Sequence, residues 1–222
     1  LGDVYKRQID GDLSHTIDIR EAPKGWSTGR FPFRAKSPYQ QPRPASEGSY
    51  FKLNESLTNW AFARTKEIPL MDTEAIAFRR RRFTETPMGQ KPPFVLRGSY
   101  LAAMNYWHGA IENEWANNWV DYWTDGRGEF VASAMEGSGM MIALKFLEQA
   151  NLVDCSRVMM LRAASNYTMQ WPGGTAIESK SGEVMGGYSA FIPSIENAYT
   201  VGSPVVREIV KNWDTYCSTL PQ

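Results

Sequence analysis

Residues 128–166 restrict the fold of this chain more than any other stretch of its sequence. The stretch opens with GEFVASAM, an apolar run that is typical of a buried strand and ends at Met135. Glu136 and three small residues follow, and the apolar spacing of MMIALKFLEQANL then predicts a helix. A second strand-like run, RVMMLRAAS, ends directly before Asn166. The order strand, turn, helix, strand predicts an α/β fold.

Two polar side chains follow the ends of these two predicted strands. Glu136 comes after the first strand, and Asn166 comes after the second. In open α/β sheets, ligands bind outside the carboxyl ends of the strands. A carboxylate accepts hydrogen bonds from hydroxyl groups, and an amide both donates and accepts them. The pattern therefore predicts that Met135, Glu136 and Asn166 lie around one pocket.

The composition narrows the class of protein. With 222 residues, of which 42% are hydrophobic and 13% aromatic, the chain can bury one sizeable core. Lys plus Arg and Asp plus Glu number 24 each, so no net charge attracts nucleic acid. The best membrane candidate, MMIALKFL, falls far short of the roughly 20 residues that a membrane helix needs. We therefore expect no nucleic-acid partner and no direct membrane span in this chain.

Metal and disulfide chemistry find little support in the sequence. Cys155 and Cys217 have no metal-binding or redox spacing, so they are expected to be two buried free thiols, with a single bridge left open. His108 and Glu112 are one helical turn apart, but His15 is distant in sequence and no third ligand is apparent. Because zinc takes three or four protein ligands, no metal is expected.

Helices are predicted in three further regions. Residues 55–84 read as two helices broken near Pro69, with Asp72 or Thr73 as the N-cap of the second. Its four arginines, residues 79–82, point about 100° apart, so they form a solvated face and cannot converge on one anion. Aromatic residues at helical spacing predict a helix within residues 106–126.

The last predicted helix begins at Ser203, with Pro204 in its first turn. Its expected buried face consists of Val206, Ile209, Val210, Trp213 and Cys217. Upstream, PFVLRGSYL reads as a strand that ends near Gly98 and Ser99, and the Gly-rich residues 167–193 read as a mobile loop over the pocket.

Several segments resemble known families. SAMEGSGMMIAL and RAASN are similar to the sugar-binding and base-binding segments of the nucleoside phosphorylase and nucleosidase superfamily. IDIREAPKGWSTGRFPFRAKSP, YWHGAIENEWANNWVDYWTDGRGEFV and ENAYTVGSPVVREIV resemble one branch, the purine nucleoside permease family. Together these matches cover most of residues 9–220.

The resemblance implies a three-layer αβα phosphorylase-like fold with a mixed central sheet. It implies that Met135 and Glu136 contact ribose, and that Asn166 contacts the purine base. Tyr106, Trp107 and His108 follow a strand and precede a helix, and the resemblance makes them candidates for stacking on that base.

The resemblance starts abruptly at Ile9, in the middle of the family pattern. Residues 1–8, LGDVYKRQ, look like a translated sequencing adapter of a metagenomic gene fragment. We therefore expect residues 9–222 to be the C-terminal two-thirds of a single domain whose first βαβ portion is missing. Bacterial members of the family commonly carry an export signal, so the resemblance suggests a soluble exported or periplasmic protein.

Three functions fit the predicted site. The first is purine nucleoside binding linked to nucleoside uptake. The second is cleavage of the N-glycosidic bond by a hydrolase or phosphorylase, with Glu136 and Asn166 as catalytic residues. Asn166 can donate a hydrogen bond but cannot act as an acid, and phosphate would be a co-substrate rather than a cofactor. The third is a homologue that has lost its ligand. No cofactor is expected, and a homo-oligomer is left open.

Overall fold

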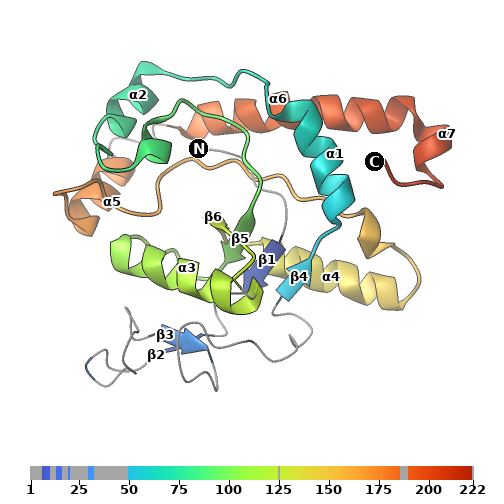
Figure 1. Ribbon diagram of the computed structural model, residues 1–222, viewed down its shortest axis with the longest axis horizontal. Helices are drawn as coiled ribbons and strands as arrows, with labels where there is room; N and C mark the ends of the chain where they lie inside the picture. Colours follow the sequence, from blue (N-terminus) through green and yellow to red (C-terminus); the bar gives the residue numbers. More distant parts are fainter. Residues whose placement is uncertain are drawn as a thin grey trace. The chain divides into compact units, whose positions relative to one another are not determined.

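The computed structural model describes residues 7–10, 14–16, 20, 30–32, 50–124, 126–185 and 190–221, and it shows a mixed α/β protein (Figure 1). The chain divides into two compact units. The described part of the first lies within Asn54–Arg97 and Arg157–Gln222, and that of the second within Lys6–Leu53 and Gly98–Ser156. We call them the helical unit and the sheet unit.

The sheet unit contains a small mixed sheet with the strand order β4-β1-β5-β6. β1 (Arg7–Asp10) pairs antiparallel with β4 (Tyr50–Lys52) and parallel with β5 (Ser99–Ala102), which in turn pairs parallel with β6 (Phe130–Ala134). β2 (Ser14–Thr16) and β3 (Arg30–Pro32) form a separate antiparallel pair. The mixed α/β class is thus confirmed.

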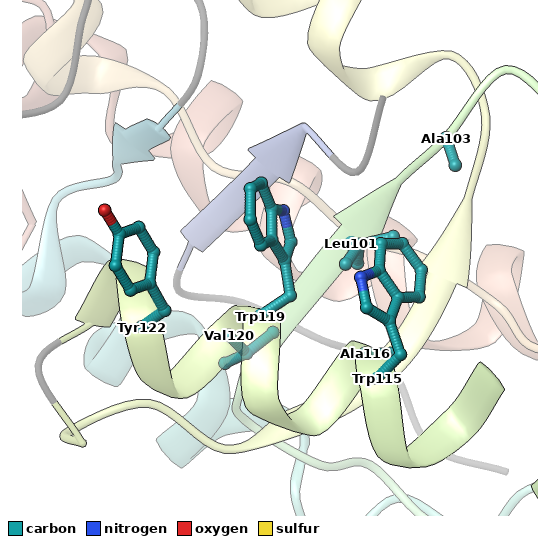
Figure 2. Close-up of a cluster of buried hydrophobic side chains, with 7 residues drawn as sticks. All are labelled: Leu101, Ala103, Trp115, Ala116, Trp119, Val120 and Tyr122. Carbon is teal, nitrogen blue, oxygen red and sulfur yellow. The ribbon is translucent and has the colours of Figure 1, made fainter. Parts of the chain in front are cut away.

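An aromatic helix forms the core of the sheet unit. α3 (Ala110–Thr124) buries Trp115, Trp119 and Tyr122 on one face, where they pack with Leu101 of β5. Figure 2 shows these rings in a row along the side of α3 that faces the strand. Because residues three and four apart lie on the same side of a helix, this spacing aligns the large rings. The predicted helix and its buried aromatic face are both confirmed.

α4 (Gly137–Gln149) follows β6, as predicted, and contacts β1. Near its end, the Glu148 carboxylate accepts hydrogen bonds from Lys145 Nζ (2.6 Å) and from the backbone N–H of Cys155 (2.9 Å). These bonds favour the ionised form, the Lys145 bond most, and lower the pKa of Glu148. The contact fixes the chain between α4 and the short 3₁₀ helix η3 (Cys155–Arg157).

The helical unit begins with the two predicted helices, and the structure shows a side-chain cap at the start of each. At the start of α1 (Glu55–Thr65), Asn54 Oδ1 accepts a hydrogen bond from the N–H of Leu57 (3.1 Å). At the start of α2 (Glu74–Arg80), Thr73 Oγ1 accepts one from the N–H of Ile76 (3.3 Å). Such side chains satisfy amide groups that have no partner within the helix. A 3₁₀ helix, η2 (Pro87–Gln90), lies downstream of α2.

The arginine run fans out as predicted. Arg80 forms a bidentate ion pair with Asp72, in which the distance from Nη2 to Oδ2 is 2.6 Å. Arg82 instead lies over the rings of Phe78 and Trp171, 5.0 and 4.6 Å from their centroids. The two side chains therefore have different partners and do not form a shared anion site.

Helix α6 (Phe191–Lys211) packs on α1 and is followed by α7 (Trp213–Tyr216). Val205 is buried with Leu57, Trp60 and Ala61 in one cluster, and Val201 is buried with Val95 in a second. Nearer its start, Asn197 clamps the backbone of Met71: Oδ1 accepts from the N–H (2.6 Å) and Nδ2 donates to the carbonyl (3.2 Å).

The start and the buried face of this last helix were predicted wrongly. α6 begins twelve residues before Ser203, and Pro204 lies inside it. Its ring removes one backbone hydrogen bond, but packing on both sides of that position holds the helix together. The buried residues of α6 are Pro193, Ser194, Asn197, Val201 and Val205. Of the predicted face, Val206, Val210, Trp213 and Cys217 are exposed, and Ile209 is partly buried against the core.

The second predicted strand, RVMMLRAAS, is also not a strand. Residues 158–165 have no regular secondary structure and pair with no strand in the described ranges. A short apolar run does not by itself specify a strand, because burial can satisfy its side chains without a ladder partner. Here Met159 packs near α1 and Leu161 near Val201, both within the helical unit.

Two further boundaries differ from prediction. β5 begins at Ser99, where the predicted strand PFVLRGSYL was expected to end. The Gly-rich segment after Asn166 contains a helix, α5 (Ala176–Met185), and is not all loop. Both cysteines are free thiols, as expected, but only Cys155 is buried and Cys217 is exposed.

Candidate functional site at the carboxyl edge of the parallel strands

Two of the predicted site segments emerge at the same edge of the sheet. β5 and β6 are parallel, with Leu101 opposite Ser133 and Ala102 opposite Ala134. The pairing continues past the end of β5, since the N–H of Ala103 donates to the carbonyl of Ala134 (3.0 Å). The segment after β5 carries Tyr106, Trp107 and His108, and the segment after β6 carries Met135 and Glu136. Because the strands end in register, both segments begin next to each other.

Glu136 occupies the N-cap position of α4. Its carbonyl accepts the N–H of Met140 (3.1 Å), while its side chain does not cap the helix. Glu136 is exposed, and Met135 before it is 52% exposed. A carboxylate at the amino end of a helix complements the positive end of the helix dipole, and the exposed Glu136 side chain lies at that end of α4.

Of the three aromatic candidates, Trp107 packs against the core, and Tyr106 and His108 stack on each other. Trp107 packs into the core, with its ring centroid 6.0 Å from those of both Trp115 and Phe130. Tyr106 is 45% exposed and His108 is half-buried. Their rings are parallel within 3°, with centroids 6.4 Å apart. Trp107 therefore anchors the segment, and its two neighbours present nearly parallel aromatic faces.

Gly109, directly after the aromatic candidates, shapes the candidate site and was not predicted from the sequence. It is buried and has φ of 134°, a value that favours glycine over residues with a Cβ. Its carbonyl accepts the N–H of Asn113 (2.9 Å) at the start of α3. The glycine thus joins the aromatic segment to the helix that buries Trp115. A glycine directly before a predicted helix was the available signal.

Asn166 lies in the helical unit, whereas Glu136 lies in the sheet unit. The Asn166 side chain is half-buried, accepting from Ser165 Oγ (3.2 Å) and donating to the carbonyl of Tyr167 (2.9 Å). Tyr167 stacks on Phe83 with ring centroids 3.9 Å apart. Its local structure is therefore well defined, and its meeting with Glu136 around one ligand stays a prediction.

The described residues contain neither of two other classes of site. No group of three or more His, Cys, Asp or Glu side chains is placed to hold a metal ion in that part of the chain. None of its helices combines the length and the apolar character that crossing a bilayer requires. A small apolar cavity in the helical unit, near Leu70, Pro193 and Asn197, has room for about one water molecule.

Sequence similarity to known proteins extends over almost the whole chain. The family model for purine nucleoside permease (NUP) matches residues 2–221. The chain belongs to the purine nucleoside permease family. The match includes most of residues 1–8, and β1 begins at Arg7, so the adapter origin of that segment stays a prediction, as does the single-domain boundary at residue 9.

Two relatives illustrate how far the similarity extends. A probable purine nucleoside permease of Schizosaccharomyces pombe is 25% identical over 218 residues, which are 95% of this chain and 62% of the relative. A purine nucleoside permease of Candida albicans is 28% identical over 198 residues, or 89% of this chain and 48% of the relative. The chain thus spans about half to three-fifths of the curated relatives it matches. No solved structure matches it significantly.

Proposed function

We propose that this chain binds a purine nucleoside at the carboxyl edge of β5 and β6, as part of a system for nucleoside uptake. The observation that carries the proposal is the parallel, in-register pairing of these strands, which starts the aromatic segment and the Met135–Glu136 segment side by side. The family membership supplies the class of ligand.

Each part of a nucleoside finds suitable chemistry at this edge. The Glu136 carboxylate is an acceptor for the two ribose hydroxyls, and Met135 offers an exposed apolar surface for the sugar. The parallel rings of Tyr106 and His108 offer faces on which a purine can stack. Trp107 is a positioning residue, because its contacts with Trp115 and Phe130 hold this segment in place. A contact between Asn166, which belongs to the helical unit, and the base stays a prediction.

The sheet topology also supports the finer fold prediction. We propose that the family shares the three-layer phosphorylase-like architecture: the described sheet is mixed, its parallel strands are β1, β5 and β6, and helices follow β5 and β6. Neither the family description nor the names of the relatives mention cleavage of a glycosidic bond, so the hydrolase or phosphorylase alternative gains no support.

Calorimetric titration with inosine tests the proposed site. The Glu136→Gln variant keeps the size of the side chain and removes its charge, so it should bind inosine roughly tenfold more weakly, because charge-assisted hydrogen bonds contribute about 1.5–3 kcal/mol. Glu129→Gln is the matched control: Glu129 is exposed just before the amino end of β6, away from the proposed site. Equal inosine affinity in wild type and Glu136→Gln would show that the Glu136 carboxylate does not contact the nucleoside.

A second measurement separates binding from turnover. The protein is incubated with inosine, with and without phosphate, and free hypoxanthine is followed. Binding without release of the base supports the permease function. Ribose 1-phosphate would identify a phosphorylase and free ribose a hydrolase, and either product would overturn the proposal. Uptake of labelled adenosine by cells that express the protein then tests the link to transport, and it should fall with Glu136→Gln.

A further inference from the structure

Helix α6 carries an exposed apolar stripe on the side opposite its buried face. The stripe consists of Ile192, Ile195, Tyr199, Val206 and Val210, each 53–67% exposed. At 3.6 residues per turn these five positions fall within an arc of about 60°. The buried residues of the helix, Pro193, Ser194, Asn197, Val201 and Val205, lie on the other side. Large apolar side chains gathered in this way on one helix are typical of an interaction surface.

The large residues of the stripe are spaced symmetrically about the middle of α6. Tyr199 and Val206 are equally distant from a point between Gly202 and Ser203, and so are Ile195 and Val210. Ile192 is as far from this point in sequence as Trp213, which is 59% exposed but lies in α7, beyond the end of α6. A helix with this symmetry can pair with an antiparallel copy of itself so that every large side chain meets another across a twofold axis.

The residues at the centre of the stripe allow two helices to approach closely. Gly202 and Ser203 lie between Tyr199 and Val206 and are half-buried, with Gly202 close to Leu161. In an antiparallel pair they face Ser203 and Gly202 of the second copy. Small residues at a helix crossing bring the two axes together, and larger residues on both sides then interdigitate. Tyr199 would lie opposite Val206, which pairs a large side chain with a smaller one.

The charges beside the stripe complement each other in the same arrangement. Glu196 and Arg207 are exposed on one flank, and Lys211 is exposed one turn beyond Arg207. In an antiparallel pair each flank meets itself, so Glu196 of one copy falls between Arg207 and Lys211 of the other. In a parallel pair this flank would instead meet the opposite flank, where Ala198 and Ile209 lie, so Glu196 would face no positive charge. Charge pairing therefore favours the antiparallel arrangement.

We propose that the α6 stripe is a homodimer interface in which two copies of α6 pack antiparallel about a twofold axis between Gly202 and Ser203. One helix pair buries less than the roughly 800 Å² per partner of a standard interface. The dimer is accordingly expected to dissociate in the micromolar range, and its formation does not depend on the nucleoside site.

Sedimentation of the 222-residue chain over a range of concentrations tests the interface. Wild type should show a monomer–dimer equilibrium, and Val206→Glu should weaken it at least tenfold, because it places like charges near the axis. Ile111→Glu is the matched control: Ile111 is 65% exposed on α3, outside the stripe, and its variant should dimerise like wild type. Circular dichroism checks that each variant is folded, and Val210→Glu provides a second stripe variant. A wild-type monomer at all concentrations, or a dimer unaffected by both stripe variants, overturns the proposal.

Disulfide cross-linking tests the direction of the helices, in a Cys217→Ser background that removes the exposed thiol. Ile195→Cys combined with Val210→Cys should give an oxidised dimer. Within one helix these positions are about 22 Å apart, too far for an internal bridge. Tyr199→Cys alone should not cross-link, because its counterpart in the second copy is Val206. Efficient cross-linking through Tyr199→Cys, without cross-linking of the 195/210 pair, would indicate parallel helices and overturn the assignment.

Discussion

The aromatic segment before α3 allows stability and ligand binding to be separated at adjacent residues. Trp107 is half-buried against Trp115 and Phe130, whereas Tyr106 is 45% exposed. Replacing a fully buried Trp by Ala costs about 3–5 kcal/mol, so the half-buried ring of Trp107 corresponds to about 2 kcal/mol. At a urea m-value of about 2 kcal/mol/M, Trp107→Ala should lower the unfolding midpoint by about 1 M.

Tyr106→Ala should behave in the opposite way. Its stability should change by only about 0.5 kcal/mol, as for most surface substitutions. If Tyr106 stacks on the purine, the loss of one base–aromatic contact of about 1–3 kcal/mol should weaken inosine binding roughly tenfold or more. Tyr106→Phe keeps the ring and is the control that should retain most of the affinity.

Urea unfolding followed by circular dichroism, and calorimetric titration with inosine, give the two quantities for each variant. The reasoning is refuted if Tyr106→Ala loses as much stability as Trp107→Ala while inosine binding is unchanged. It is also refuted if Trp107→Ala leaves the unfolding midpoint where it was, because Trp107 would then not anchor the segment.

Three other predictions concern the sheet unit and the free thiols. Gly98→Ala should lower stability by about 1–3 kcal/mol in urea unfolding, because the new Cβ would lie 2.5 Å from a methyl carbon of Val131; an unchanged midpoint would mean that β6 shifts freely. Glu148→Gln should destabilise the protein at neutral pH. Since the folded state lowers the pKa of Glu148, its contribution is present above the ordinary carboxyl pKa and is lost as pH falls through the folded value. The stability difference between wild type and variant should thus shrink in acid, and a difference independent of pH would contradict this. Cys217 is exposed, whereas burial raises the pKa of the Cys155 thiol, so a thiol reagent should modify Cys217 first and Cys155 only on unfolding; equal rates would show that Cys155 is accessible.

Local signals in the sequence were sufficient where one residue decides the conformation. Thr73 was a correct N-cap candidate because its side chain replaces a missing backbone partner. The helix with the Trp115 and Trp119 rings was predicted correctly because its aromatic residues recur at helical spacing from Trp115 to Trp123.

Other features were decided by contacts between distant segments. Ser203-Pro204 has the composition of a helix start, yet α6 runs through it, because the helix is held on both sides by packing that no local pattern encodes. The run at residues 158–165 has strand-like composition, but its apolar side chains are used in packing without a ladder partner. For the site, the sequence placed Glu136 correctly after a strand. It did not reveal that Trp107 packs against the core while Tyr106 and His108 stack on each other.

The proline inside α6 has a consequence for how the helix opens. Because Pro204 has no N–H, the carbonyl of Thr200 receives no amide from the next turn, and the hydrogen-bond ladder is interrupted there. The half before it is tied to Met71 by Asn197, and the half after it is packed on α1 by Val205. Each half therefore has its own anchor. Fraying of the amino-terminal turns need not spread into the carboxyl-terminal ones, and the amide protons of the two halves should exchange with solvent as separate groups.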